Sequence, residues 1–301
     1  MKITRQRVDG VLLLNKPVGI SSNAALQKAK WLLAALKAGH TGTLDPFADG
    51  LLPLCFGEAT KFSGYLLESD KRYRATMRLG VTTTTGDPEG AVLAERPVTV
   101  DCADVAAALP RFVGAIEQIP PMHSALKHQG RPLYEYARAG IEIERPPRKV
   151  HIAALSLVEC DLPHVVFDVS CSAGTYVRTL AQDIGEALGC GAHLTALTRT
   201  AAGGFELRDS HTLDAIEARS DPAERLKILL PVDSLVRHVP ALPLSPAEAN
   251  ALCQGRMIDT PGIADGLMRL YCHNSFLGLG NVGAERLAVR RLLSTGIPES
   301  G

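Results

Sequence analysis

Residues 37–46 read KAGHTGTLDP and continue as FADGLLP to residue 53. The segments on either side have helical apolar patterns, but this stretch has none. Gly39 and Gly42 permit backbone conformations that other residues avoid, and Pro46 biases Asp45 away from the helical region. The pattern predicts a loop that can fix one carboxylate among small neighbours. Spacing alone favours a simpler interpretation, in which Asp45 only caps the next turn.

The rest of the chain alternates between strand and helix patterns. Short apolar or alternating runs predict strands at residues 11–14, 71–79, 153–158, 165–171 and 194–200. Helical periodicity predicts helices at residues 58–67, 101–109 and 176–188, and one that starts at residues 21–23 and carries Leu26, Ala29, Leu33 and Leu36. Thr175 is the expected cap of the helix at residues 176–188.

The expected strand at residues 71–79 alternates strictly between two faces. Tyr73 lies on its apolar face, whereas Arg72, Arg74 and Arg78 share the opposite face. A solvated face is the common interpretation of such a strand. Every charge on this face is positive, however, so it is also a candidate surface for phosphates.

Composition bounds the class of protein. The chain has 301 residues, 21% charged and 46% apolar, with a formal net charge of zero. These values are typical of a soluble globular protein with room for two domains, in which any polyanion must meet a local basic surface. No apolar run approaches ~18 residues, so we expect a cytoplasmic protein that does not bind membranes.

Cysteine and histidine spacing bears on redox and metal chemistry. The seven cysteines form no C-x-x-C pair, which argues against a disulfide framework or a zinc site and for a reducing compartment. The nine histidines are scattered without ligand spacing, so no metal is expected. Residues 278–283 match G-x-G-x-x-G, but no helix pattern follows them, and we interpret the match as accidental.

Two segments stand apart from the regular pattern. Residues 118–150, called the thumb segment below, are irregular apart from a short helix near residues 134–139, and carry six Lys or Arg against three Glu. A long basic insertion of this kind is more often functional than decorative. Prolines interrupt residues 231–246, which predicts a linker before a small β module with one short helix at residues 248–253.

The loop around Asp45 carries a family resemblance. Residues 39–53 follow G-H-T-G-T-L-D-P-x-A-x-G-x-L-P, which resembles the catalytic motif of the bacterial TruB family of tRNA pseudouridine synthases. Further motifs of that family follow in order, including GEATK at 57–61, T-x-T-x-D-x-x-G at 83–90, IPP-x-x-SALK at 119–127 and GTYVRTL at 174–180. The resemblance covers about 200 residues and fades after Pro231.

The resemblance implies an enzyme that converts the T-loop uridine at position 55 of tRNA to pseudouridine. It implies an α+β fold with a mixed, largely antiparallel central sheet in a catalytic domain at residues 1–237. The thumb segment would be its RNA-gripping insertion, and residues 238–301 a PUA-like RNA-binding module. The reaction changes no redox state and adds no external group, so no cofactor is expected.

The resemblance also assigns residues. Asp45 matches the catalytic aspartate, ionised in its free form at neutral pH, and Arg178 matches the arginine that pairs with it. Tyr73 matches the ring that stacks on the flipped uracil. The remaining candidate binding residues are Tyr176 and Leu197 in the pocket and His40 against the opened T loop.

Two alternatives to a stand-alone tRNA enzyme remain open at this stage. A non-catalytic RNA-binding or RNA-folding protein would keep the basic surfaces but would not require Asp45, Tyr73 and Arg178 together. A guide-RNA-dependent pseudouridine synthase would share the catalytic residues. The thumb segment and the lack of basic low-complexity tails favour an enzyme that acts as a monomer on the T stem-loop of tRNA, without an obligate protein partner.

Overall fold

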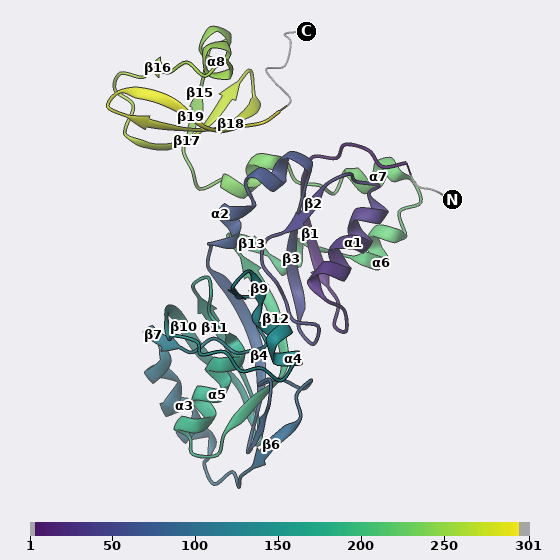
Figure 1. Cartoon of the computed structure of the whole chain (residues 1–301), viewed down its shortest axis with the longest axis vertical. Coiled ribbons are helices and arrows are strands. Elements are labelled where there is room, and N and C mark those ends of the chain that lie inside the picture. The colour runs from purple at the N-terminus through teal and green to yellow at the C-terminus, as the bar shows by residue number, and fades with distance from the viewer. Residues whose placement is uncertain (1–3, 295–301) are drawn as a thin grey trace.

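The computed structural model describes residues 4–294, which form an elongated molecule with one large sheet and a smaller one at its end (Figure 1). The large sheet has the order β14-β1-β3-β12-β4-β11-β10-β7, with β2 paired to β3 and β13 to β12. Its strands are β1 (Gly10–Lys16), β2 (Ala38–His40), β3 (Asp49–Phe56), β4 (Lys71–Leu79), β7 (Gly114–Gln118), β10 (Arg148–Asp161), β11 (His164–Cys171), β12 (Ala192–Ala202), β13 (Phe205–Glu206) and β14 (His211–Thr212). Only the β1–β14 and β3–β12 pairs are parallel, which confirms the predicted mixed, largely antiparallel α+β fold.

Short helices and turns cover this sheet and connect its strands. The helices are α1 (Ser22–Leu32), α2 (Ser63–Leu67), α3 (Cys102–Ala108), α4 (Leu133–Arg138), α5 (Val177–Ala187), α6 (Leu213–Glu217) and α7 (Pro222–Leu226). The 3-10 turns are η1 (Gly57–Lys61), η2 (Leu109–Phe112), η3 (Leu207–Asp209) and η4 (Val232–Val236). Two small hairpins, β5 (Val81–Thr83) with β6 (Val92–Glu95) and β8 (Lys127–His128) with β9 (Arg131–Pro132), complete this part. Within residues 4–294 no helix has the length and apolarity to cross a membrane.

Strand β1 is buried on both faces and separates two apolar clusters. Leu12 and Leu14 face the main cluster, to which α1 and α5 contribute, whereas Val11 and Leu13 face a second cluster. Side chains that alternate along a strand explain how one run of leucines serves both. Each fully buried Leu stabilises the fold by about 2 kcal/mol relative to an exposed one.

The smaller sheet has the order β15-β17-β18-β19-β16. Its elements are β15 (Ala241–Pro243), α8 (Pro246–Cys253), β16 (Ile258–Asp259), β17 (Gly266–Cys272), β18 (Ser275–Gly283) and β19 (Arg286–Leu292). It packs on the second cluster, where the rings of Phe62 and Phe276 lie 5.5 Å apart. The G-x-G-x-x-G match lies inside strand β18, so it forms no phosphate-binding turn.

Two local expectations are wrong. The helix expected at residues 58–67 is divided into η1 and α2, because the chain bends at Phe62 to bury its ring completely. Thr175 does not cap α5, since Tyr176 occupies the cap position. Instead, Gln118 of β7 holds the Tyr176 backbone, accepting from its N–H at 3.0 Å and donating to its C=O at 3.2 Å.

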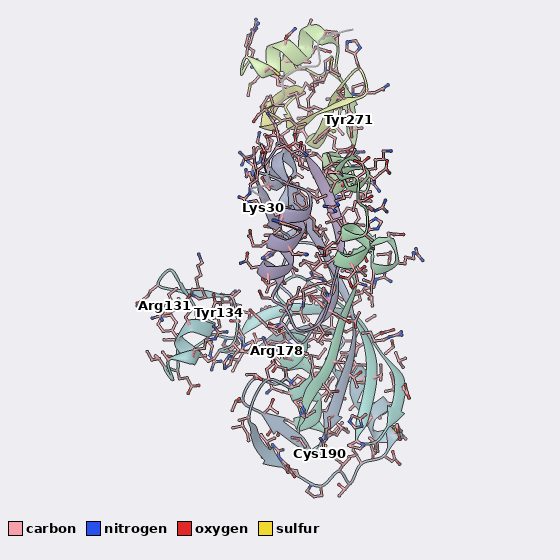
Figure 2. All side chains as sticks on the ribbon, turned by 90° about the vertical axis from the view of Figure 1, so that its right-hand side faces the viewer. Lys30, Arg131, Tyr134, Arg178, Cys190 and Tyr271 are labelled. Carbon is pink, nitrogen blue, oxygen red and sulfur yellow. A yellow bond between two sulfur atoms is a disulfide. The ribbon has the colours of Figure 1, made fainter. Side chains whose placement is uncertain are left out.

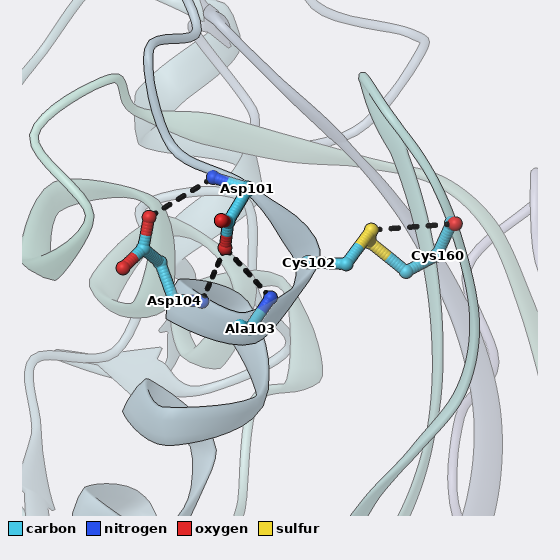
Figure 3. The surroundings of a disulfide bond; sticks show 5 residues. All are labelled: Asp101, Cys102, Ala103, Asp104 and Cys160. Atoms are coloured by element: carbon cyan, nitrogen blue, oxygen red, sulfur yellow. Dashed lines mark hydrogen bonds between the residues drawn. A yellow bond between two sulfur atoms is a disulfide. The ribbon is translucent and has the colours of Figure 1, made fainter.

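A disulfide joins Cys102 to Cys160, which corrects the expectation from cysteine spacing (Figure 3). Asp101 caps α3 through the N–H groups of Ala103 and Asp104, and this start of the helix brings Cys102 to the end of β10, with a Cα–Cα distance of 5.9 Å. The sequence separation of 58 residues hides a contact that only the tertiary fold creates. The other five cysteines are free thiols.

Opening this disulfide should lower stability, because the bond closes a long loop in the unfolded chain. We expect Cys102→Ser to reduce the free energy of unfolding by about 3 kcal/mol under oxidising conditions. Denaturant titration with and without reductant measures the difference, and Cys253→Ser, which removes an exposed free thiol, is the matched control. Equal midpoints for the wild type in both conditions would show that the bond adds nothing to stability.

Candidate active site

The loop that carries Asp45 is fixed by buried backbone hydrogen bonds. The Ser22 hydroxyl accepts from Leu44 N at 2.7 Å and donates to Leu44 O at 2.9 Å, directly before Asp45. After it, Gly19 N donates to Pro46 O at 2.8 Å and Ala48 N donates to Asp45 O at 3.1 Å. The loop is therefore held on both sides of Asp45, which leaves its side chain one orientation.

Arg178, in the first turn of α5, holds the Asp45 carboxylate. Its Nε lies 3.1 Å from Asp45 Oδ2, and its side chain is only 4% exposed against 34% for Asp45. Its Nη1 lies 3.2 Å from Asp87 Oδ2, and its Nη2 donates to His123 O at 2.7 Å. The predicted pair of Asp45 and Arg178 is present, and a second carboxylate completes it.

Asp87, in the motif at residues 83–90, is this second carboxylate. It is 2% exposed and accepts hydrogen bonds from Glu89 N at 3.0 Å and from the Thr85 hydroxyl. Thr85 O also accepts from Arg178 Nη1 at 3.0 Å. The T-x-T-x-D-x-x-G motif therefore builds a turn that presents one carboxylate and one carbonyl to the guanidinium.

A cavity of about 430 Å³ lies beside the ion pair. Asp45, Tyr73, Tyr176, Arg178 and Leu197 all line it, so the structure brings together five of the six predicted site residues. His40 is the exception, because it lies on β2, which pairs with β3 through His40 and Leu54. Its partly buried ring is not among the side chains that line the cavity.

Burial sets the protonation of these groups. Burial raises the pKa of Asp45, and the nearby Arg178 guanidinium opposes this shift only in part. Burial also raises the pKa of the Tyr73 and Tyr176 phenols and lowers the pKa of His40. The cavity therefore combines neutral aromatic walls with one carboxylate whose charge depends on its arginine.

Two further cations, Lys71 and Arg199, also line the cavity. The Lys71 amine donates to backbone carbonyls that include Leu66 O at 3.3 Å, and burial lowers its pKa to about 8. Arg199 is only 1% exposed. In the sequence Lys71 lies beside Arg72 at the start of a strand pattern and Arg199 lies between two threonines, and neither context indicates that the side chain lines a cavity.

The basic face of β4 is less basic than the sequence suggested. Asp168 of β11 binds Arg74 at two points, both 2.8 Å, and Glu206 of β13 pairs with Arg72. These acids come from other strands of the sheet, so the residue pattern along β4 alone could not predict them. Arg78 has no ion pair within residues 4–294.

The thumb segment projects sideways from the body, and Arg178 lies near its root (Figure 2). Arg145 is turned inward and donates to Pro120 O at 3.1 Å, and Arg131 pairs with Glu135 at 2.8 Å. Lys127 and Arg148 are exposed, without an acidic partner among the described residues. Part of its positive charge thus shapes the segment, and part faces solvent.

Three family models match the chain in succession. The TruB family pseudouridylate synthase N-terminal domain matches residues 30–177, the tRNA pseudouridylate synthase B C-terminal domain matches residues 178–237, and the pseudouridine synthase II TruB C-terminal model matches residues 240–293. The chain belongs to the TruB family of pseudouridine synthases. The motifs around Asp45, Asp87 and Arg178 fall in the first two of these matches.

Curated relatives match over nearly their whole length. A tRNA pseudouridine synthase B of Thiobacillus denitrificans is 68% identical over 98% of this chain and 99% of its own. Proteins of the same name from Azoarcus sp. and Chromobacterium violaceum are each 56% identical, over 98% and 96% of both chains respectively. This TruB chain is therefore an enzyme of pseudouridine formation.

Solved structures share its fold. A chain of a Cbf5–Nop10–Gar1 complex superposes with a TM-score of 0.72 at 27% identity, over 94% of this chain and 84% of its own. A chain of an H/ACA RNP bound to a substrate RNA containing 2′-deoxyuridine gives the same TM-score and coverage at 25% identity. The similarity extends through both sheets of the TruB chain.

The raised pKa of Asp45 predicts how the rate depends on pH. If the ionised carboxylate is required, pseudouridine formation should fall on acidification at a pH above the ordinary range of Asp, because burial raises the pKa of Asp45. Arg178→Gln removes the charge that lowers this pKa, so its acid limb should move to higher pH. Single-turnover rates with saturating enzyme measure the limb without binding defects.

Arg178→Lys is the matched control for charge. It keeps one positive charge but loses the planar fork, so the acid limb should stay near that of the wild type. We expect the activation free energy to rise by about 2 kcal/mol, the scale of a misplaced charged hydrogen bond. If the acid limb of the pH–rate profile stayed at the same pH in Arg178→Gln, the ion pair with Arg178 would not be what sets the pKa of Asp45.

Proposed function

We propose that this chain converts uridine to pseudouridine at position 55 in the T loop of tRNA. The observation that carries the proposal is the Asp45 carboxylate, ion-paired to Arg178 at 3.1 Å on the wall of a cavity with aromatic sides. The names of the curated relatives support tRNA as substrate class, and the motif resemblance at residues 39–53 supports the T-loop position.

The cavity suits one base that has left its stack. Its volume of about 430 Å³ is large enough for one pyrimidine, and its lining by Tyr73, Tyr176 and Leu197 offers apolar contact to the base. A base inside a folded RNA must be turned out of the helix before an enzyme reaches its glycosidic bond. Stacking on Tyr73 would offset part of the energy lost when the base leaves its neighbours.

The reaction needs a carboxylate but no cofactor. Uracil is detached from C1′, turned, and rejoined through C5, with the C5 proton released and N1 protonated at the end. Asp45 is the group placed to act at the sugar or the base, and Arg178 keeps it charged against the effect of burial. His40, outside the cavity, is assigned to the opened T loop rather than to the base.

The thumb segment and the C-terminal module are assigned to RNA binding. Lys127 and Arg148 are both exposed. Lys127 directly follows the cavity-lining residues Ala125 and Leu126, and Arg148 pairs across strands with Gln118, which holds the backbone of Tyr176. Phosphate contacts of this kind position an RNA without reading its sequence. The domains follow as a catalytic unit at residues 1–237 and a PUA-like RNA-binding unit at residues 238–301.

Asp45→Asn should abolish the chemistry and leave binding intact. The amide keeps the size of the side chain but supplies no carboxylate, while the phosphate contacts lie elsewhere. We expect no detectable pseudouridine in a single-turnover assay with purified tRNA, and a Kd for tRNA close to that of the wild type. Wild-type turnover by Asp45→Asn would remove Asp45 from the mechanism, and a wild type inactive on tRNA without partner proteins or guide RNA would favour the guide-dependent alternative.

Removing exposed thumb cations should weaken binding and reduce its salt dependence. Each phosphate contact releases about one counterion, so Lys127→Ala with Arg148→Ala should lower the slope of log Kd against log salt by roughly two. Binding titrations at several salt concentrations measure this slope. A control pair, Lys28→Ala with Lys227→Ala, removes two cations from α1 and beyond α7 and should leave the slope unchanged; an unchanged slope in the thumb pair would place the RNA elsewhere.

A further inference from the structure

Arg199 of β12 is the largest fully buried side chain in the described part of the protein. Its Nε donates to Leu51 O at 2.6 Å, and its Nη2 donates to Gly42 O at 3.5 Å. It lines the same cavity as Asp45 and Tyr73. The Tyr73 hydroxyl is a further hydrogen-bond partner of the guanidinium. A guanidinium can donate five hydrogen bonds, so these three partners leave donors available.

The local backbone is built closely around this side chain. Gly50 pairs with Arg199 across the parallel β3–β12 contact and has a φ of +99°. A Cβ on Gly50 would lie 2.5 Å from Arg199 O, so only glycine fits there. Gly42, with a φ of +120°, lies under the guanidinium, where a Cβ would be 3.6 Å from Nη1. Gly42, in the loop that carries Asp45, and Gly50, in β3, thus leave the space that Arg199 occupies.

The charge of Arg199 has no counterion among residues 4–294. Arg178 meets two carboxylates, whereas no ion pair is formed by Arg199. A buried cation without a partner is costly, because water is lost and no anion replaces it. The positive charge of Arg199 acts on the side chains of the cavity. Burial raises the pKa of the Tyr73 phenol and the guanidinium partly opposes this rise; burial lowers the pKa of Lys71 and the guanidinium lowers it further.

The proposed reaction supplies the missing anion. When the C1′–N1 bond breaks, its electron pair stays with the uracil ring and spreads over N1, O2 and O4. If the carboxylate instead attacked C6, the electron pair of the C5–C6 bond would move toward O4. In each case negative charge develops on the base, and it leaves the base when C5 uses an electron pair to bond to C1′ and the Asp45 carboxylate is regenerated. The loss of the C5 proton and the protonation of N1 that follow balance each other.

We propose that Arg199 is a further catalytic residue, whose unpaired guanidinium stabilises the negative charge on the uracil while it is detached. The inference rests on the proposed function, because the anion is the base of that reaction. Fixed positive charge at a site where charge develops is among the largest contributions to catalysis. The competing role is purely structural, a clamp that ties Gly42 O and Leu51 O to β12.

Two substitutions separate charge from clamping. Arg199→Gln keeps a donor for one carbonyl but removes the charge, and we expect the single-turnover rate to fall about 100-fold. Arg199→Lys keeps the charge and should stay within about tenfold of the wild type at neutral pH. Arg225→Gln is the matched control, since Arg225 also donates to backbone carbonyls, Arg219 O and Leu32 O, but lies in α7 away from the cavity. It should keep the wild-type rate.

The dependence of the rate on pH in Arg199→Lys separates the two roles. If Arg199 were only a structural clamp, this substitution would not change that dependence. Burial near this cavity lowers the pKa of Lys16 and of Lys71 to about 8 each. The introduced amine should titrate in the same range, so the rate should fall as pH rises through it. In the wild type position 199 does not titrate in this range, because arginine stays protonated. Lys71 is common to both proteins, so the limb of Arg199→Lys is measured as the difference between the two pH profiles.

The outcomes are distinct. A wild type that forms no pseudouridine in tRNA overturns the proposed function and this inference with it. An active wild type with Arg199→Gln folded and within threefold of its rate overturns the inference alone, as does an Arg199→Lys variant without an alkaline limb. Should Arg199→Gln fail to fold, by circular dichroism and thermal melting, the rate and pH profile of Arg199→Lys decide alone.

Discussion

The guanidinium of Arg178 between Asp45 and Asp87 is the interaction on which the site depends. It is almost completely buried, so its attraction to both carboxylates is little screened by water. Through it, the first turn of α5 is joined to the loop after β2, to the turn at residues 83–90 and, by His123 O, to the thumb segment. Loss of the arginine would leave both carboxylates without the cation that pairs with them.

The large sheet explains why these segments meet. The parallel contact of β12 with β3 brings Leu197 and Arg199 beside the end of the loop that carries Asp45, and the antiparallel contact of β12 with β4 brings Tyr73 opposite Arg199. One strand therefore carries an apolar wall and a cation to the same cavity. The result is a pocket that can hold a neutral base and accommodate charge on it.

Much of this was predictable from sequence. Strict alternation at residues 71–79 placed Tyr73 on the inner face, and the motifs at residues 39–53 and 174–180 predicted the ion pair of Asp45 with Arg178. What could not be predicted depends on contacts between distant segments. Gln118 replaces Thr175 at the start of α5, and acids from β11 and β13 neutralise part of the basic face. Such partners have no fixed spacing in the chain.

The disulfide has a topological consequence for the thumb segment. Cys102 and Cys160 lie on either side of it in sequence, so residues 102–160 form a covalently closed ring that contains the whole segment. Its base is tied twice, by sulfur and by the pairing of β7 with β10. A single cut in the backbone of the thumb segment would open this ring without dividing the protein into two pieces. The thumb segment can therefore bend while its two ends stay together.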